Sequence, residues 1–156
     1  MRKYKREVKG LIEKIEILKK CDTVRLALFD GEYPYIIPLN FGFEFKNDAL
    51  ILYFHCAKEG KKLDLIKNNN KAAFECDCLH KLITAETACG YSMDYESICG
   101  VGDIEIIEGD EKKVALNIIM KHYSEKDNYV FDNKIIEITQ IIRLTVKDYT
   151  AKRLKH

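Results

Sequence analysis

Apolar and polar residues recur with two different periods over the first thirty positions of the chain. Residues 10–20 place apolar side chains at helical spacing, which predicts an amphipathic helix. Residues 22–30 alternate with period two instead, with Val24, Leu26 and Leu28 on one face and Arg25, Ala27 and Phe29 on the other, which predicts a strand. The Asp30-Gly31 pair at the end of this strand is typical of a hairpin turn. The chain therefore begins with a helix that is followed by a strand and a tight reversal.

The next predicted strand, residues 33–41, contains both prolines of the chain. Because proline cannot donate to a hydrogen-bond ladder, Pro34 and Pro38 favour an edge, a bulge or an opening of the sheet at this point. A turn at positions 47–48 leads into a third alternating strand over residues 49–55. We expect these two strands to pair as a hairpin, which would bring their ends close together.

The rest of the chain continues with alternating and helical segments. They are a helix at about 59–68, a strand over 71–78, a loop or lid over 79–93, a long strand over 95–108, a helix capped by Asp110 that runs to about 122, and a strand over 139–147. Paired strands with occasional helices favour a mainly β (α+β), barrel-like domain over a parallel sheet. No repeat or linker interrupts the pattern, so we expect one domain over residues 1–156.

Composition is consistent with this fold and excludes several classes of function. Hydrophobic residues make up 47% of the 156 positions and charged residues 33%, which is ordinary for a globular protein. The net charge of +1 gives no field that would draw the chain to nucleic acid or to a membrane. The sequence shows neither a signal peptide nor an apolar run of about 20 residues. We therefore expect a cytoplasmic protein whose six cysteines are reduced thiols.

The stretch from residue 49 to residue 70 carries the strongest chemical signal. It predicts a strand ending in His55, a short loop and a helix that opens with Lys61 and Lys62 directly after Gly60. Lysines are electrostatically unfavourable at a helix N-terminus, which already carries partial positive charge. A phosphate bound there would reverse this cost, because the free amides, the helix dipole and both ammonium groups would converge on it. The alternative interpretation is a solvated basic turn.

Three segments of this part of the chain could form one site. They are Pro38-Leu39-Asn40-Phe41, Phe54-His55-Cys56-Ala57 and Gly60-Lys61-Lys62. The first follows a proline-interrupted strand, which leaves backbone groups free to meet a planar heteroatom ring. The second ends the neighbouring strand, and the third supplies the anion-binding turn. A flat aromatic cofactor with a phosphate tail would match all three segments.

Other candidate sites are weaker. Cys76, Cys78 and His80 could be imagined as zinc ligands, but their spacing fits no standard zinc motif, so we assign no metal site. Adjacent strand residues face opposite sides of a sheet, so Cys56 and His55 should not act together as nucleophile and base. His122 lies near the end of a predicted helix, where an imidazolium would favour the helix dipole.

The order of motifs along the chain resembles that of a known family. The first block runs from Arg25 to Phe41 as R-x-A-x-x-D-G-x-x-P-Y-x-x-P-x-N-F, the second is Y-F-H-x-A-x-x-G-x-K from Tyr53 to Lys62, and the third is Y-x-S-x-x-G-x-G from Tyr95. Together they are similar to the FMN-binding split barrels related to pyridoxamine 5′-phosphate oxidase, and in particular to the branch that includes the Nim nitroimidazole-resistance proteins. The resemblance covers roughly residues 10–147.

This resemblance implies a six-stranded antiparallel split barrel with flanking helices, which forms a homodimer and binds FMN at the subunit interface. It places the FMN phosphate on Lys61 and Lys62, the flavin ring beside Phe54 and His55, and a further flavin contact at Ser97. The additional arginines and the C-terminal motif that the oxidase uses for pyridoxamine phosphate are missing. The resemblance therefore does not imply pyridoxamine phosphate oxidase activity.

Two functions follow as hypotheses. The first is an FMN-dependent oxidoreductase, resembling the nitroreductases, that acts on a small electrophile and in which His55 supplies a proton. The second is a carrier or sensor that holds FMN or haem without turnover, with His55 as a possible axial ligand. Neither hypothesis involves nucleic acid or a membrane.

Overall fold

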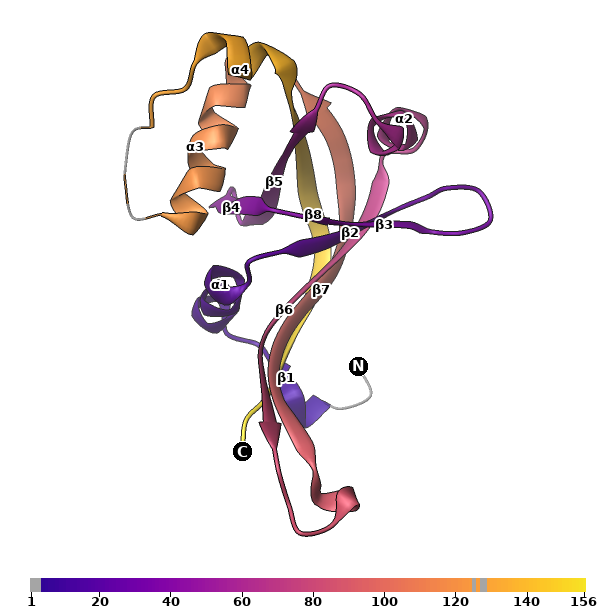
Figure 1. Ribbon diagram of the computed structural model, residues 1–156, viewed down its shortest axis with the longest axis vertical. Helices are drawn as coiled ribbons and strands as arrows, with labels where there is room; N and C mark the ends of the chain where they lie inside the picture. Colours follow the sequence, from indigo (N-terminus) through magenta and orange to yellow (C-terminus); the bar gives the residue numbers. More distant parts are fainter. Residues whose placement is uncertain (1–3, 125, 127–128) are drawn as a thin grey trace.

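The computed structural model describes residues 4–124, 126 and 129–156, and the strands among them form one sheet. The elements in chain order are η1 (Tyr4–Arg6), β1 (Glu7–Val8), α1 (Leu11–Lys20), β2 (Val24–Leu28), β3 (Tyr35–Leu39), β4 (Phe41–Lys46), β5 (Ala49–Ala57), α2 (Lys61–Asn68), β6 (Lys71–Ile83), η2 (Ala88–Gly90), β7 (Ser92–Ile107), α3 (Glu111–Tyr123), α4 (Asn133–Ile138) and β8 (Thr139–Leu154). Figure 1 shows a curved barrel wall from which one long hairpin projects.

The sheet confirms the expected antiparallel split barrel. Within the described residues, eight strands form a single sheet in the order β3-β2-β6-β7-β8-β5-β4, and β1 pairs with β8. The two strands beyond the expected six are β1 and β4. The edge strands β3 and β4 are separated in the chain by Asn40 alone, yet they lie at opposite ends of the sheet order. The sheet therefore opens at this point, and we call the opening between β3 and β4 the split.

The predicted hairpin between residues 33–41 and 49–55 is wrong for most of its length. β3 pairs with β2 across the turn that contains Gly31, and Leu28 lies opposite Tyr35. β5 pairs instead with β4, which the sequence pattern did not separate from the strand before it. The strand break at Asn40 explains the difference, because β3 ends at Leu39 and a new strand, β4, starts at Phe41.

The segment predicted as a loop or lid over residues 79–93 is mostly strand. β6 extends to Ile83 and β7 starts at Ser92, so the two strands form a long hairpin with η2 near its tip (Figure 1). The register between these strands shifts between Cys78 and Lys81. We call residues 79–94 the arm. Residues 79–93 show no clear hydrophobic period, which hid these strand ends, and polar residues hid the end of β8, which continues well past residue 147.

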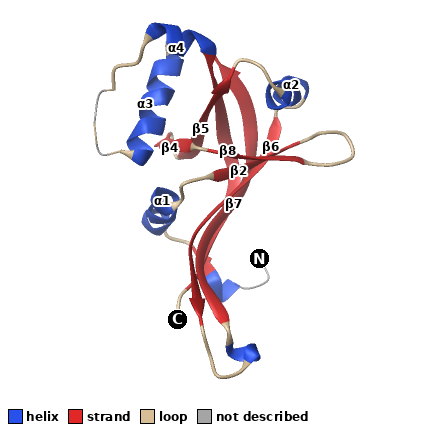
Figure 2. Cartoon of the chain, in the orientation of Figure 1, coloured by secondary structure: helices blue, strands red, loops and turns tan. Residues whose placement is uncertain are grey.

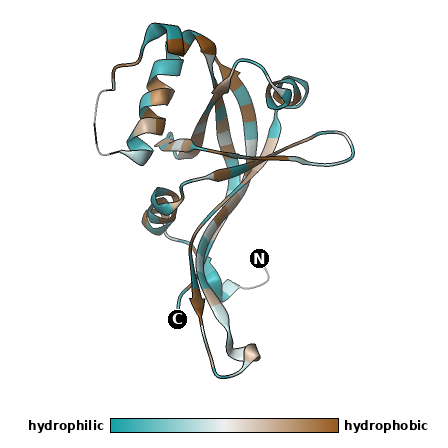
Figure 3. Ribbon diagram, viewed as in Figure 1, coloured by the Kyte–Doolittle hydropathy of each residue, from teal (hydrophilic) through white to brown (hydrophobic). Residues whose placement is uncertain are grey.

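Side chains pack into two apolar clusters on opposite faces of the barrel wall. The main core fills the barrel and includes Leu52 and Phe54 of β5. A smaller cluster includes Ile51 and Tyr53 of the same strand and packs against α3. Figure 2 shows α3 and α4 on one side of the sheet and α2 on the other, and Figure 3 shows hydrophobic positions alternating with hydrophilic ones along the central strands. This alternation assigns every side chain of β5 to one face or the other.

Helix α3 lies directly on β4. A side chain at Gly42 would come within 2.6 Å of the α3 backbone at Ile118, so only glycine permits this close approach. α3 starts after Asp110, but the Asp110 side chain makes no capping hydrogen bond, which corrects the predicted cap. In the described part of the chain, no helix has the length and apolar character that crossing a membrane requires.

Candidate functional site at the split of the barrel

The N-terminus of α2 lies at the end of β5, as the sequence predicts. Its N-cap residue Gly60 has φ 138° and ψ 153°, a conformation that is essentially restricted to glycine. No side chain caps the helix, so its first amides remain available to an anion. Lys61 and Lys62 are the first two helical residues. The local sequence thus builds an uncapped helix start that carries two cations.

The two lysines have different surroundings. Lys61 Nζ lies 2.5 Å from Asp30 Oδ2, in the turn after β2, and 5.4 Å from the centre of the Tyr35 ring. Lys61 therefore links α2 to the β2–β3 hairpin, and its charge already has a carboxylate partner. This pairing was not predicted, although the Asp30-Gly31 turn was recognised as a hairpin signal.

Lys62 has no ion pair within the described part of the chain. Its ammonium group lies near the Cys56 thiol at the end of β5: burial raises the pKa of this thiol, and the charge of Lys62 opposes that rise. A cation with no carboxylate partner, beside uncapped helix amides, is the arrangement that a phosphate group would complete. Of the two lysines, Lys62 is the stronger candidate for a phosphate contact.

The segments around Phe41 and Phe54 do meet, but through β4. Phe41 lies directly opposite Phe54 in the β4–β5 ladder. Both side chains are fully buried in the core, so neither ring is exposed to a ligand in this structure. Pro38 and Asn40 are exposed along the split, Leu39 is half-buried, and Asn40 Nδ2 donates to the Asp22 carbonyl over 3.4 Å. The split therefore offers a ligand the exposed residues of this segment and its backbone.

His55 is exposed, and among the described residues no hydrogen bond or ion pair holds its ring. It follows Ile51 and Tyr53 on the face of β5 that α3 covers, as predicted. Cys56, which lies near Lys62, packs against the core on the other face. His55 and Lys62 therefore lie on opposite sides of the end of β5, and a ligand that contacts both must pass around this strand end.

Ser97 is not brought together with the other candidate residues. It lies on β7 opposite Lys152 of β8, whereas Phe54 lies opposite Ile142 of β8. Ten residues along β8 separate these two contact points, which corresponds to roughly 33 Å of extended strand. Ser97 is thus near the base of the arm, remote from α2 of the same chain.

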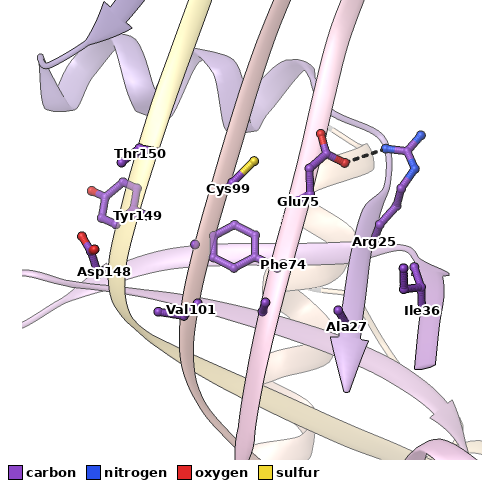
Figure 4. A pocket seen from close by; sticks show the side chains of 12 residues that line it. Arg25, Ala27, Ile36, Phe74, Glu75, Cys99, Val101, Asp148, Tyr149 and Thr150 are labelled. Carbon is purple, nitrogen blue, oxygen red and sulfur yellow. Dashed lines mark hydrogen bonds and ion pairs between the residues drawn. The ribbon is translucent and has the colours of Figure 1, made fainter. Parts of the chain in front are cut away.

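A groove on the outer face of the sheet was not predicted. It has a volume of about 520 Å³ and crosses β2, β6, β7 and β8 (Figure 4). Ala27, Ala73 and Val101 contribute to its apolar floor, and the ion pair between Arg25 and Glu75 forms one rim. Small side chains at alternate strand positions are the signal that could have revealed it.

The cysteines and histidine of the imagined zinc site, and His122 of α3, are buried or hydrogen-bonded within the protein. Cys76 and Cys78 are buried in the core, and the His80 ring lies 2.7 Å from Asp77 Oδ2. In the described residues, no group of three or more His, Cys, Asp or Glu side chains is arranged to hold a metal. His122 shares a hydrogen bond with the Cys21 carbonyl at 2.8 Å, and burial lowers its pKa. A neutral His122 does not serve the helix dipole as predicted; it links α3 to the end of α1.

Comparison with known proteins assigns the chain to a family. Residues 13–153 match the family described as pyridoxamine 5′-phosphate oxidase, and the chain belongs to this family. A solved structure from Bacteroides thetaiotaomicron, a protein to which 5-nitroimidazole antibiotic resistance is ascribed, is 32% identical and has a TM-score of 0.80. The match covers 94% of this chain and 86% of that one. The comparison with functionally curated proteins gave no match.

More distant structures share the fold. The flavocytochrome Anf3 from Azotobacter vinelandii is 17% identical with a TM-score of 0.78, and the match covers 100% of this chain and 72% of that one. An FAD- and haem-binding protein from Mycobacterium smegmatis is 18% identical with a TM-score of 0.82, and the match covers 97% and 74% of the two chains. At these identities the similarity extends to the architecture of the split barrel.

Proposed function

We propose that this protein binds FMN at the split of the barrel and uses it to reduce a small electrophile such as a nitroaromatic compound or a quinone. The observation that carries the proposal is Lys62, a cation without an ion-pair partner in the described residues, placed beside the uncapped start of α2. Family membership and the flavoproteins among the structural neighbours support the choice of a flavin.

The residues present fit a phosphate-bearing cofactor. Lys62 and the amides of the first two residues of α2 would hold the phosphate, since the Leu63 amide already donates to the Gly60 carbonyl. Exposed Pro38 and Asn40 would border the ring at the split. When bound, FMN supplies the redox chemistry, and the protein contributes binding, orientation and a proton source.

His55 is the candidate proton donor. It is exposed and not held by any described residue, so its ring is free to meet a substrate. Imidazole can donate or accept a proton near neutral pH, which suits the reduction of a nitro or quinone oxygen. The fold places His55 and Lys62 on opposite sides of the end of β5. A ligand that contacts both residues would therefore have to extend past this strand end.

We further propose that the protein is a homodimer whose partner subunit completes the site. Ser97 is remote from α2 within one chain, so it could contact a cofactor at the split only from the other subunit. The apolar outer groove, with Ile36 and Val101 more than half exposed, offers a surface for such an interface. Sedimentation at micromolar concentration tests this point, and a monomer that still binds FMN would contradict it.

A second candidate function is haem binding without turnover. The unbonded His55 ring is the specific observation, because neutral imidazole is a common axial ligand of haem iron. Two of the structural neighbours are described as a flavocytochrome and as an FAD- and haem-binding protein. The absorbance spectrum of protein purified without added cofactor separates a flavin from a haem.

The experiment that tests FMN binding compares two ligands and two lysines. FMN should bind tightly and riboflavin, which lacks the phosphate, far more weakly. Lys62→Ala should lower FMN affinity by about ten- to a hundredfold, since a charge-assisted hydrogen bond contributes about 1.5–3 kcal/mol. Lys61→Ala is the matched control and should cost less, because Lys61 already pairs with Asp30. Normal FMN binding by Lys62→Glu would place the phosphate elsewhere.

The catalytic role of His55 has its own test. His55→Ala should keep most FMN affinity and lower electron transfer to a nitroaromatic or quinone acceptor, with NAD(P)H or dithionite as reductant. Turnover that is unchanged from pH 5 to 8 in this variant would remove His55 from the mechanism.

A further inference from the structure

A polar pocket of about 260 Å³ lies at the base of the arm, distant from α2. The end of α1, the start of β2 and the irregular part of β6 enclose it. Its lining residues are Lys20, Asp22, Thr23, Arg25, Asp77, Cys78, Leu79 and His80. Most of them are polar or charged, in contrast to the apolar outer groove, with which the pocket shares Arg25.

Three of these residues form a chain of hydrogen bonds. Arg25 Nη1 donates to Asp77 Oδ1 over 2.6 Å, and the His80 ring nitrogen Nε2 lies 2.7 Å from Asp77 Oδ2. Burial raises the pKa of Asp77, but the bonds from Arg25 and His80 outweigh this and keep it below its ordinary value. An ionised carboxylate thus fixes the imidazole from one side, which is the way a proton-transfer histidine is oriented in many sites.

The backbone at His80 is unusual for a residue with a side chain. Leu79 has φ 80° and His80 has φ 45°, so two consecutive non-glycine residues adopt the left-handed region. They lie where the β6–β7 register shifts, so the strain coincides with the turn of His80 onto Asp77. Strained backbone of this kind is energetically costly and concentrates at functional sites.

The pocket has more hydrogen-bond donors than acceptors left to use. Both oxygens of Asp77 are engaged, whereas Arg25 uses only Nη1 in its bonds to Glu75 and Asp77. The Thr23 hydroxyl and two of the three Lys20 hydrogens remain, since the Lys20 bond to Glu96 uses one. Of the lining carboxylates, only Asp22 lies outside these bonds, and it is exposed. Cys78 is not a competing acid, because burial raises its pKa to about 12.

We propose that this pocket binds a small oxyanion, a carboxylate or an inorganic phosphate, between Arg25, Thr23 and His80. Its volume, just below the usual range of pockets for drug-sized compounds, suits a small ligand. Because Nε2 of His80 faces Asp77, Nδ1 is the ring nitrogen left to face an oxyanion. None of these residues lies at α2, but Asp77 lies opposite Ser97, which the proposed dimer places at the cofactor, so binding is tested both with and without FMN to distinguish the two sites.

The test follows the ring signal of His80 by NMR in the full-length protein, with and without FMN. Sodium phosphate and sodium acetate are the probes, and sodium chloride at equal ionic strength is the reference. We expect a saturable shift of the His80 ring signals with each oxyanion and none with chloride. Thr23→Val should weaken oxyanion binding by about three- to tenfold, the value of one hydrogen bond.

A matched histidine provides the control. His156 Nδ1 lies 2.8 Å from Asp94 Oδ1 in a similar pair, but His156 lines none of the described pockets. His80→Gln should abolish saturable binding, as seen from the backbone amides around residue 23, while His156→Gln should leave it unchanged. A non-saturable shift that chloride reproduces, or equal oxyanion affinity in His80→Gln, would overturn the proposal. Arg25, Asp77 and His80 would then have only a structural role at the base of the arm.

Discussion

Charged groups at the split and the buried Glu96 carboxylate at the base of the arm differ in whether the protein provides them with bonded partners. At the split, the described residues give Lys62 and His55 no bonded partner, and the start of α2 has no cap. At the base of the arm every buried carboxylate has cations around it: Lys20 and Arg153 bond the fully buried Glu96. The difference separates two uses of polar groups. The Glu96 carboxylate serves the fold, whereas Lys62 and His55 at the split are positioned and then left for a ligand.

The largest effect on folding stability is expected at Glu96, the fully buried carboxylate of this comparison. Glu96→Gln should lower the free energy of unfolding by about 2–3 kcal/mol, because Lys20 and Arg153 would lose their shared counter-ion. Glu13→Gln is the matched control: Glu13 also pairs with Arg153 but is half-exposed, so its loss should cost at most about 1 kcal/mol. Urea unfolding measures both, and equal losses would contradict the structural role of the buried carboxylate.

Glu96 also predicts a pH dependence. Burial raises its pKa, but hydrogen bonds from Lys20 and Arg153 outweigh burial and bring the pKa below the ordinary value. The unfolded chain then binds more protons than the folded one on the acid side, so stability is complete above the ordinary glutamate pKa and falls as pH drops toward the folded pKa. The Glu96→Gln variant should lose this part of the acid sensitivity.

A smaller loss of stability, with a larger loss of binding, is expected at Gly60. Gly60→Ala forces a side chain into a φ of 138° and should cost about 1–3 kcal/mol. It should also weaken FMN binding, because the strain shifts the first amides of α2. Gly109→Ala, at φ 67° and with open space for a methyl group, controls for backbone strain alone. Should both variants bind FMN equally, the start of α2 would not be the phosphate site.

The same two regions also differ in how much of their structure the sequence could predict. At the split, the functional features are local: Gly60 and the two lysines are consecutive, and the pattern of residues 49–70 predicted strand, turn and helix correctly. At the arm, the partners are distant, since Arg25 and Asp77 are 52 positions apart. Hydrophobic periodicity carries no information about such pairs, and the arm, whose apolar residues follow no clear period, was mistaken for a loop.

The opening of the sheet was predicted for the correct reason, but the strand that pairs with residues 49–55 was predicted incorrectly. Proline in the strand of residues 33–41 indicated an opening, and β3 is an edge strand. The alternation of Phe41, Phe43 and Phe45 could have shown that β4 is a separate strand, because these positions face the core independently of β3. The sequence could not show that Lys61 pairs with Asp30 while Lys62 has no ion pair among the described residues. This difference depends on the fold of the β2–β3 turn.

A modest pH effect is expected at His122, which joins the end of α1 to α3. Burial lowers its pKa, and the hydrogen bond to the Cys21 carbonyl opposes this only in part. The unfolded histidine, with a pKa of about 6.5, binds a proton that the folded one resists, so stability should fall as pH drops below about 6.5 toward the folded pKa. His122→Gln should flatten the stability curve in this range, measured by urea unfolding at several pH values. A curve of unchanged slope would show that His122 is not the titrating group.

The smallest effect, and the sharpest test of the comparison, concerns Asp30. Its carboxylate lies 2.5 Å from Lys61 Nζ, and both groups are partly exposed, so the pair contributes little stability. If the split keeps cations for a ligand, Asp30 competes with a bound phosphate for Lys61. Asp30→Asn should then raise FMN affinity by about two- to fivefold, the range of an exposed ion pair, without raising riboflavin affinity. The double variant with Lys61→Ala should lose this gain. A lower FMN affinity in Asp30→Asn would instead mean that Asp30 holds Lys61 in place for the cofactor, and that the lysines act together as the sequence first indicated.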